Sequence, residues 1–484
     1  MSIILLGIPW ESSPVTDRQS DVLIIGGGFS GTMLAVHLLR QTDLSIAVID
    51  RGALPGRGLA YGSPHQFHLL NVPAGEMSAW PDAPDDFLRW ARTHYDASLQ
   101  ARSFPPRSVY GAYVAHLLEA TLDEFGKDRF QWIRDEARSL HRGKGRLTVQ
   151  TDLGTELLAR VVVMATGNFP PANPRLPGLT ASSSRYFQFA WDKNVLEDLP
   201  ATGSVLLLGS GLTSVDLITA LKSKGFRGVI RVLSHKGLFP RPRRQQRPDE
   251  PWPLFWDETS PRTVRGLLRL IRNQVRAAAA QGINWRAVID GLRPVTQEIW
   301  RSLPIEEQRR FVRHLRAYWD VHRHRVAPEI SDLLDDMRSD GLVRLHAGTV
   351  TRYSETEHVV EVRYRDRENR TVKTLRVDRV INCSGSETDC RRIDESFITS
   401  LVVQGFARPD RLFLGMDVDQ HGALIDYRGE PSQRLYSIGP VRKGCFWETT
   451  AVPEIRNQAA VLATHLADMF QHGKVGQGSV LKTA

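Results

Sequence analysis

The sequence predicts an α/β fold with two Rossmann-like dinucleotide-binding domains, the first discontinuous and the second inserted into it together with a helical insertion. Two βαβ patterns, which start near residues 21 and 204, carry this prediction, because each places a glycine-rich turn directly after an apolar strand. The length agrees, since 484 residues exceed one ordinary domain and suit two or three.

The first βαβ pattern begins with the apolar run 21–25, which is typical of a buried parallel strand. This run leads into a G-x-G-x-x-G turn formed by Gly26, Gly27, Gly28, Phe29, Ser30 and Gly31. We expect Gly26 to allow the tight turn, Gly28 to let a pyrophosphate approach the backbone, and Gly31 to bring helix and strand together. The alternative is a glycine turn in another kind of α/β protein.

The elements after this turn favour a nucleotide site. Residues 32–40 carry apolar side chains at helical spacing, and strand 45–49 ends at Asp50, 22 residues after Gly28. A carboxylate at this place can accept hydrogen bonds from a ribose diol. Strand, glycines, helix, strand and acid in register are much stronger evidence than the glycines alone.

A later strand, 160–164, ends in Ala165-Thr166-Gly167, a turn that recurs beneath the dinucleotide in FAD domains. Strand 434–438 is followed by Gly439, after which an apolar-periodic helix extends to about residue 469. Pro453 and Glu454 suit the first turn of that helix, whose N-terminus can face the electron-rich pyrimidine edge of a flavin. We therefore expect all of these turns at the FAD site.

The second βαβ pattern has strands 204–208 and 229–233 and a helix over 215–224. Its turn, Gly209-Ser210-Gly211-Leu212-Thr213-Ser214, has a serine in place of the third glycine, and serine is small enough for close packing of helix and strand. We expect Gly209, Gly211, Thr213 and Ser214 to bind a nicotinamide dinucleotide.

The end of strand 229–233 favours NADPH over NADH. An NAD site would place an acid there, whereas this sequence has Ser234, His235 and Lys236, with Arg241 and Arg243 beyond. These side chains can bind the 2′-phosphate that an acid would repel. For the basic run 241–247, the alternative is a solvated loop, especially at Arg247.

The remaining chain has fewer signals. Residues 260–340 have helical character, including a His- and Arg-rich stretch, 314–325, that is either a substrate-facing helix or a helix held by salt bridges. Strand 377–381 ends in Asn382-Cys383-Ser384-Gly385, a turn expected at the return to the FAD domain. The expected boundaries are a flexible leader 1–20, FAD-domain segments 21–198 and 346–470, a nicotinamide domain 199–345, and a flexible tail 471–484.

Composition limits the classes of function. The net charge of +9 and pI of about 9.6 favour anionic partners, but no nucleic-acid motif is present. Three cysteines form no CxxC pair and no metal-ligand spacing, which predicts a reducing compartment, no metal and no dithiol reductase. We expect a soluble, cytoplasmic protein without a membrane or nucleic-acid partner; its oligomeric state is open.

Several segments together resemble a family of bacterial FAD/NAD(P)-binding proteins related to nitrosuccinate-forming L-aspartate N-monooxygenases. More distant relatives are the ornithine/lysine N-hydroxylases and flavin monooxygenases, and an FAD-dependent urate hydroxylase is similar in organisation. The resemblance spans nearly all of residues 20–470 and is carried by residues 57–62, 70–74, 77–82, 85–90, 104–111, 318–325 and 447–456.

The resemblance implies roles for particular residues. Arg57 would contact FAD, and the segment with Asn71 and Val72 would line the flavin ring. Asn71 would be the hydrogen-bonding candidate near the nicotinamide and oxygen; the alternative is a turn-forming asparagine. Apart from the resemblance, a basic pocket with Arg243, Arg323 or Arg325 would suit an anionic substrate such as an amino acid or urate.

One segment departs from the broader flavin monooxygenases. Their F-x-G-x-x-x-H-x-x-x-W/Y motif is matched here at Trp191, but Phe187 stands where the histidine would be. This puts membership of that subclass in doubt.

The expected function is an NADPH-using, FAD-dependent monooxygenase. It would act through a C4a-hydroperoxyflavin, with O₂, on a small, anionic, nitrogen-containing substrate. The alternatives are an NAD(P)H-dependent flavin reductase or dehydrogenase without oxygenation, and a non-catalytic redox-sensing flavoprotein.

Overall fold

The computed structural model describes residues 18–473 except 64, 144, 181–182, 193 and 244–251. The described residues form two compact units. Unit 1 contains those up to Gln66, Pro73–Phe169 and those from Thr388 on, whereas unit 2 contains Phe67–Val72 and Pro170–Glu387. The outer parts of the expected leader and tail, together with Arg244 and Arg247, lie outside the described residues.

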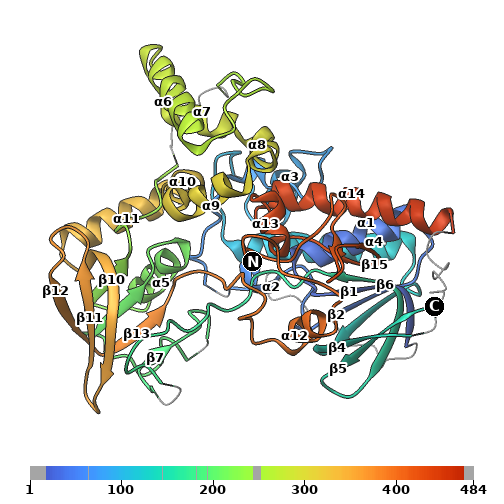
Figure 1. Ribbon diagram of the computed structural model, residues 1–484, viewed down its shortest axis with the longest axis horizontal. Helices are drawn as coiled ribbons and strands as arrows, with labels where there is room; N and C mark the ends of the chain where they lie inside the picture. The colour runs from blue at the N-terminus through green and yellow to red at the C-terminus, as the bar shows by residue number, and fades with distance from the viewer. Residues whose placement is uncertain are drawn as a thin grey trace. The chain divides into compact units, whose positions relative to one another are not determined.

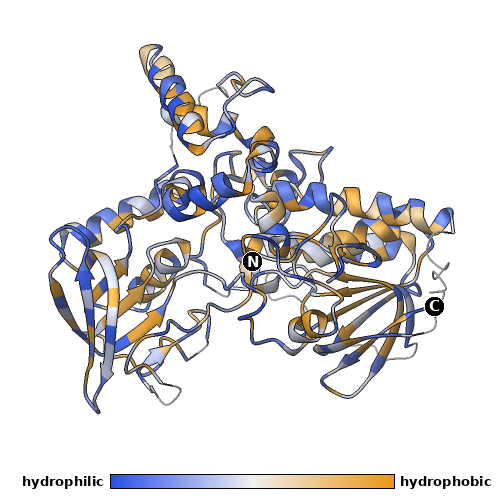
Figure 2. Ribbon diagram, viewed as in Figure 1, coloured by the Kyte–Doolittle hydropathy of each residue, from blue (hydrophilic) through white to orange (hydrophobic). Residues whose placement is uncertain are grey.

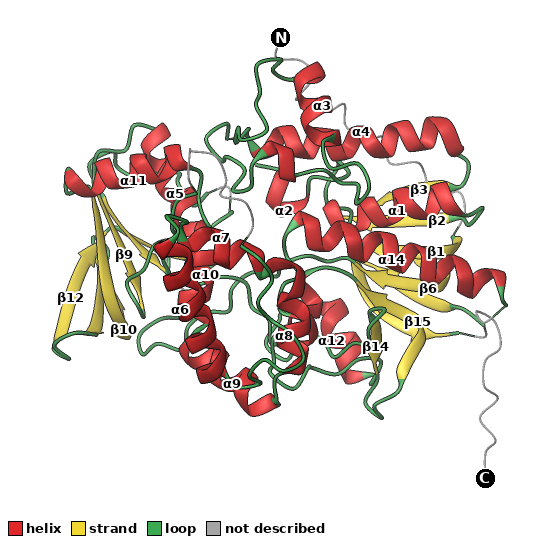
Figure 3. Ribbon diagram, turned by 90° about the horizontal axis from the view of Figure 1, so that it is seen from above, coloured by secondary structure: helices red, strands yellow, loops and turns green. Residues whose placement is uncertain are grey.

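Unit 1 is built on one sheet whose main strand order is β14-β15-β6-β1-β2-β3 (Figure 3). Its strands are β1 (Gln19–Ile25), β2 (Ile46–Asp50), β3 (Phe130–Arg134), β4 (Ala137–Arg142), β5 (Leu147–Thr151), β6 (Glu156–Met164), β14 (Ala423–Ile425) and β15 (Pro431–Ser437). The strands from β15 to β3 pair in parallel, and β4 and β5 form an antiparallel hairpin beside β6.

Helices cover this sheet because its central strands are apolar on both faces. Figure 1 shows α1, α4 and α14 on the same side of the sheet, and α1 packs against the other two. The strands of this sheet are partly orange in Figure 2, and the central strands β1, β2 and β6 are largely buried. The helices are α1 (Phe29–Gln41), α2 (Gly58–Tyr61), α3 (Asp86–His94), α4 (Arg107–Phe125), α12 (Ser396–Val403), α13 (Lys443–Phe446) and α14 (Val452–Gln471), with 3₁₀ turns η2 (Ala74–Glu76) and η4 (Pro440–Arg442).

Unit 2 has a second sheet with the order β12-β11-β10-β9-β8-β13-β7. Its strands are β7 (Tyr186–Phe187), β8 (Ser204–Leu208), β9 (Val229–Ser234), β10 (Val343–Glu355), β11 (Val360–Asp366), β12 (Val372–Val377) and β13 (Arg379–Asn382). From β10 to β7 the neighbours pair in parallel, whereas β10, β11 and β12 form an antiparallel meander at one edge.

The helical segment predicted within unit 2 is confirmed. Helix α5 (Leu212–Ser223) follows β8, and the stretch before β10 is helical, with α6 (Val264–Ala280), α7 (Trp285–Gly291), η3 (Arg293–Val295), α8 (Thr296–Ser302), α9 (Ile305–His314), α10 (Arg316–Arg323) and α11 (Pro328–Ser339). Helix α11 packs against α5 and β10, and α6 packs against α7 and α9.

The two units differ from the expected domain boundaries. The chain leaves unit 1 at 169/170 instead of 198/199, because β7 pairs with β13. It returns at 387/388 instead of 345/346, because β10 pairs with β9 and leads into the meander. Strand β1 begins at Gln19, two residues inside the expected leader.

Candidate cofactor-binding sites

The first glycine-rich turn connects β1 to α1, and two of its glycines are required by the fold itself. Gly26 has a φ of +105°, and a Cβ on it would lie 2.4 Å from the carbonyl oxygen of Ala165. A Cβ on Gly31 would lie 1.9 Å from the carbonyl oxygen of Gly26. The expected roles of these two residues, in the tight turn and in the close approach of helix and strand, agree with this geometry.

Gly28 is different, because the folded chain has room for a side chain there. Its φ is −70°, and the nearest atom to an added Cβ would be the Cα of Gly58, 3.5 Å away. Packing therefore gives no reason for a glycine at this position. Open backbone at the N-terminus of a 13-residue helix is what a pyrophosphate needs in order to approach the N–H groups.

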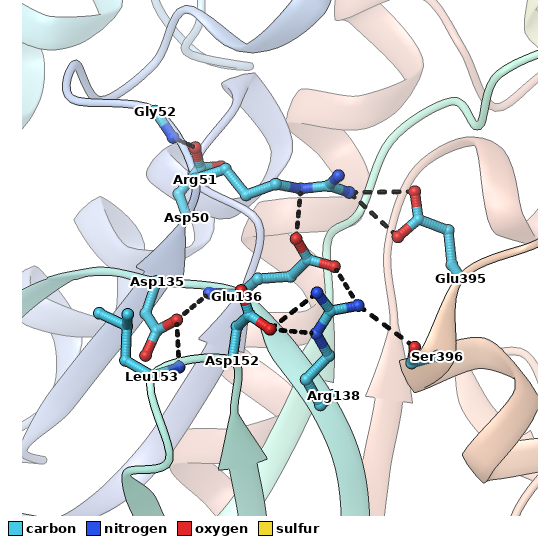
Figure 4. A network of polar contacts seen from close by, with 10 residues as sticks. All are labelled: Asp50, Arg51, Gly52, Asp135, Glu136, Arg138, Asp152, Leu153, Glu395 and Ser396. Atoms are coloured by element: carbon cyan, nitrogen blue, oxygen red, sulfur yellow. Dashed lines mark hydrogen bonds and ion pairs between the residues drawn. The ribbon is translucent and has the colours of Figure 1, made fainter.

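Asp50, at the end of β2, is the residue predicted to bind the ribose, and its side chain also hydrogen-bonds to the first glycine-rich turn. Its Oδ2 accepts a hydrogen bond from the Gly27 amide at 2.6 Å, and its Oδ1 accepts one from the Gly52 amide at 2.6 Å. Figure 4 shows Asp50 beside a surface network in which Arg51 contacts Glu136 and Glu395. Because a carboxylate oxygen has two lone pairs, Asp50 can hold the turn and still accept from a ribose.

Sequence reasoning missed the loop that packs against this turn. The Gly56 amide donates to the Gly27 carbonyl at 2.8 Å and lies 2.9 Å from Oγ1 of Thr32, while Thr32 Oγ1 donates to the Gly27 carbonyl at 3.0 Å. Arg57 follows directly, and partial burial lowers the pKa of its guanidinium. The loop therefore brings Arg57 to the turn, and Thr32, one residue beyond the motif, was a possible signal.

The other two turns that the sequence predicts at the FAD site lie against the first one. The Ala165 amide donates to the Ile25 carbonyl at 2.8 Å, and Gly167 has a φ of +69°. Oγ1 of Thr166 is shielded from solvent and has no hydrogen-bond partner among the described residues. A Cβ on Gly439 (φ +85°) would lie 3.0 Å from Oγ of Ser30. A shielded, unpaired hydroxyl at this turn fits a polar ligand.

Helix α14 begins as predicted, with Pro453 and Glu454 in its first turn. Just before it, Thr449 is fully buried, and its Oγ1 has no hydrogen-bond partner among the described residues. No side chain caps the helix. Thr449 was not predicted as a site residue, although it lies within the segment 447–456 that carries the family resemblance.

The second turn, between β8 and α5, repeats the first with one change. Gly209 has a φ of +116°, and its Cβ would lie 2.2 Å from the carbonyl oxygen of Cys383, which corresponds to Ala165 in unit 1. Ser214, in the place of Gly31, is buried and donates from Oγ to the Gly209 carbonyl at 2.6 Å. Ser214 thus hydrogen-bonds to the Gly209 carbonyl, whereas in the first turn Gly31 packs directly against the Gly26 carbonyl.

The turn at residues 382–385 therefore belongs to the second site. It had been expected to mark the return to the FAD domain, but β13 pairs with β8, and Gly209 packs on Cys383. Burial raises the pKa of the Cys383 thiol to about 12, so this cysteine is an inert part of the turn.

Gly211, like Gly28, lies where the folded chain has room for a side chain. Its φ is −81°, and a Cβ there would meet no atom within 4 Å. Thr213 lies half-buried in the first turn of α5. Unit 2 thus also presents an open helix N-terminus to a ligand.

The end of β9 carries the residues predicted to contact the 2′-phosphate. Ser234 Oγ accepts from Ser210 Oγ at 2.8 Å and from the Gly237 amide at 3.1 Å, so it ties the two strand ends together. His235 is exposed, with Nδ1 3.2 Å from Thr349 Oγ1, and Lys236 lies over the Tyr318 ring, 5.6 Å from its centroid. Arg241 is exposed and hydrogen-bonds through its backbone to Val321 and Val326.

The segment with Asn71 and Val72 is part of unit 2, although the chain on both sides of it belongs to unit 1. Arg243 Nε donates to the Asn71 carbonyl at 2.7 Å. His68 Nε2 lies 3.1 Å from the Asp216 carbonyl oxygen, and the His68 ring meets Trp191 edge-on. The structure therefore gives Arg243, predicted as a substrate residue, a backbone partner in the predicted flavin-lining segment.

The other two predicted substrate residues lie at the end of α10. Arg323 and Arg325 are both buried, at 5% and 3% exposure. Arg325 forms an ion pair with Asp290 of α7. Residues 314–325 were predicted either to face the substrate or to be held by salt bridges. At Arg325 the ion pair supports the second role.

Two sheets with parallel central strands, each with a glycine turn, an open helix N-terminus and a strand-end polar residue, define a protein with two dinucleotide-binding folds. Residues 23–169 match a family described as FAD-NAD(P)-binding, which confirms the predicted cofactor class.

Known proteins are similar in sequence to part of this chain. A Baeyer–Villiger monooxygenase of Stachybotrys chlorohalonatus is 26% identical over 226 residues, which are 44% of this chain and 33% of that protein. The chain spans about a third of the length of the curated relatives it matches.

Two solved structures cover almost the whole fold. Reduced ornithine hydroxylase from Pseudomonas aeruginosa has a TM-score of 0.60 at 15% identity, over 93% of this chain and 99% of that one. An ornithine N-hydroxylase of Kutzneria, with reduced FAD, NADP⁺ and L-ornithine, has a TM-score of 0.60 at 14% identity, over 94% and 100%. These similarities confirm the predicted fold.

Within the described residues, no helix has both the length and the apolar character to cross a membrane.

Proposed function

We propose that unit 1 binds FAD, that unit 2 binds NADPH, and that the protein is a flavin-dependent monooxygenase. The observation that carries this proposal is the pair Gly28 and Gly211. Each has ordinary backbone angles and open space where a side chain would be, so a ligand that must approach the backbone is the physical reason for each glycine.

When bound, FAD and NADPH would supply the reducing equivalents and the activation of O₂ that place one oxygen atom on a substrate and release the other as water. The residues of this chain bind and orient. The open N-termini of α1 and α5 favour the two pyrophosphates, and Asp50 accepts from the FAD ribose. The absence of an acid in Ser234-His235-Lys236, at the end of β9, favours the 2′-phosphate of NADPH.

The proposed substrate is a small, anionic, nitrogen-containing molecule that undergoes amino-acid N-hydroxylation or urate-type hydroxylation. The N-hydroxylases share the fold over nearly the whole chain, and the net charge of +9 suits an anion. Asn71 is the candidate beside the reacting atoms. Arg243 would position it by holding its carbonyl group.

A second candidate is Baeyer–Villiger oxygenation of a ketone. It is favoured by the sequence similarity of the curated relatives, at 24–28% identity. Both candidates need NADPH and oxygen, and they differ in the product. A flavin reductase without oxygenation would consume NADPH with every turnover but give no oxygenated product.

Substitution of the two open glycines tests the cofactor assignment. Gly28→Ala fits the folded chain, so we expect normal folding but loss of most bound FAD, seen as loss of the flavin absorbance. Gly211→Ala should keep the flavin and lose rapid bleaching by NADPH under anaerobic conditions. Each variant is the control for the other. Retention of FAD by Gly28→Ala together with normal bleaching of Gly211→Ala would remove the basis of the proposal.

Oxygenation is tested by admitting O₂ to the NADPH-reduced protein with amino acids, urate or ketones present. Product formed in proportion to NADPH consumed supports a monooxygenase and identifies the substrate. If NADPH is consumed but hydrogen peroxide is the only product with every compound tested, the protein is a flavin reductase instead.

A further inference from the structure

The positive charge of the chain is concentrated in the helical segment of unit 2. Residues 252–325 contain fourteen arginines, seven acidic residues and no lysine, so they carry +7 of the net charge of +9. Neither proposed cofactor site uses α6, which carries part of this charge.

Helix α6 has four arginines in one row. Arg265, Arg269, Arg272 and Arg276 follow each other at intervals of four, three and four residues, which places them on one side of a helix over about 16 Å. All four are exposed. We call them the arginine row.

The arginine row has no acidic counterpart among the described residues. Helix α6 contains no Asp or Glu, and within the row Arg276 donates a hydrogen bond to the Asn273 side-chain oxygen at 3.3 Å. Several arginines on other surface helices are paired, for example Arg309 with Glu306 on α9 and Arg338 with Asp335 on α11. Four uncompensated charges in a line repel each other and attract an anionic surface.

Apolar side chains occupy the other side of the same helix, and two of them, Leu268 and Val275, border the arginine row. Of the residues in α6, Val264 and Ala278 are buried, whereas the larger apolar residues are half-buried: Leu267, Leu268, Leu270, Ile271 and Val275. Figure 2 shows the resulting mixture of hydrophilic and hydrophobic residues along α6. A basic, acid-free helix with a partly exposed apolar side has the composition of an interfacial membrane helix.

We propose that α6 binds the surface of an anionic lipid bilayer through the arginine row. Lipid headgroups are mobile, so each arginine can find a phosphate without a fixed register, and the half-buried Leu268 and Val275 beside the row can contact the acyl boundary. A nucleic acid would supply phosphates but would make no use of these apolar side chains. The proposal departs from the expectation of no membrane partner, which rested on the lack of a spanning segment.

Sedimentation of the full-length, FAD-loaded chain with vesicles tests the proposal. Phosphatidylcholine vesicles with and without phosphatidylglycerol, at a ratio of about two to one, should show binding only when the anionic lipid is present. Raising the salt concentration should release the protein, because exposed charges are screened.

The variant Arg269→Gln/Arg272→Gln should bind these vesicles about 30-fold more weakly, at about fivefold for each arginine. The control Arg338→Gln/Arg376→Gln removes the same charge at two exposed positions on other elements and should bind normally. Equal binding by both variants, or no binding of the unmodified chain, would overturn the proposal. Binding of a double-stranded DNA fragment that depends on the row, without vesicle binding, would assign it to nucleic acid instead.

Discussion

At the scale of the residue, Asp50 shows that a side chain predicted to face a ligand also organises the protein. Both of its carboxylate oxygens accept backbone hydrogen bonds at 2.6 Å, from Gly27 and Gly52. The Gly27 bond holds the turn that would receive the pyrophosphate. One carboxylate therefore couples the shape of the phosphate site to the ribose site.

Asp50→Asn should weaken this coupling. An amide has only one accepting oxygen, so one backbone N–H would face an NH₂ group, at a cost of about 1–3 kcal/mol. We expect unfolding of the apo-protein at lower urea concentration and faster release of FAD. The same change at Asp152, which is exposed and pairs with Arg138 in Figure 4, should have little effect on either property. Equal effects of the two substitutions would contradict the role of Asp50.

At the scale of the element, α1 is buried from Phe29 to Leu39 because it packs against the sheet, α4 and α14. It also carries His37, which is 6% exposed. Burial, with a smaller contribution from Arg40, lowers the pKa of His37 to about 4, against an opposing effect of Asp82. Charging this imidazole would place a cation inside the helix packing.

This burial makes stability depend on pH in a defined window. The pKa of His37 in the folded state is below its unfolded value of 6.5. At pH values well above 6.5 the imidazole is neutral in both states, so His37 does not make stability depend on pH there. As the pH falls towards 4, the unfolded state gains a proton that the folded state does not, and stability is lost. Between pH ~7 and ~5 the loss from His37 should be about 2 kcal/mol.

Urea unfolding at the two pH values measures this loss. His37→Gln should reduce the pH dependence by that amount, whereas His472→Gln, at an exposed histidine, should leave it unchanged. An unchanged pH dependence in His37→Gln would show that the imidazole is not held neutral by the fold.

The sequence predicts those features that depend on neighbouring residues. Both βαβ units, the positive-φ glycines Gly26 and Gly209, and the helix start at Pro453 follow from local patterns of apolar residues, glycine and proline. The edge meander β10–β12 was not predicted because its strands are mostly polar on one face, and the place of β10 beside β9 depends on pairing over a long sequence separation.

The site residues show the same limit. Gly28 and Asp50 could be found from spacing, but the shielded hydroxyls of Thr166 and Thr449 could be recognised as unpaired only in the fold. The contact of Arg243 with Asn71 joins residues 172 positions apart, so no sequence pattern contains it. A charged residue in a basic run could therefore be interpreted as a substrate ligand although the structure gives it a backbone partner.

At the scale of the whole molecule, the two units have separate cores, and each contains one complete βαβ site. The apolar core of unit 1 surrounds β1 and β6, whereas that of unit 2 includes β8, β9 and α5. Because each sheet is hydrogen-bonded within its own unit, a ligand that binds one glycine turn stabilises mainly that unit against local opening.

Hydrogen exchange of the FAD-loaded protein with and without NADP⁺ tests this independence. At an NADP⁺ concentration about 100 times its Kd, opening reactions that release the ligand should be suppressed about 100-fold, which is about 2.7 kcal/mol. We expect this slowing in β8, α5 and β9, over residues 204–234, and much less in β1, α1 and β2. Gly211→Ala should abolish the slowing, because an added Cβ occupies the space that the proposed pyrophosphate needs. Equal slowing in both βαβ units would show that they open together, so that NADP⁺ binding in unit 2 also stabilises the FAD site in unit 1.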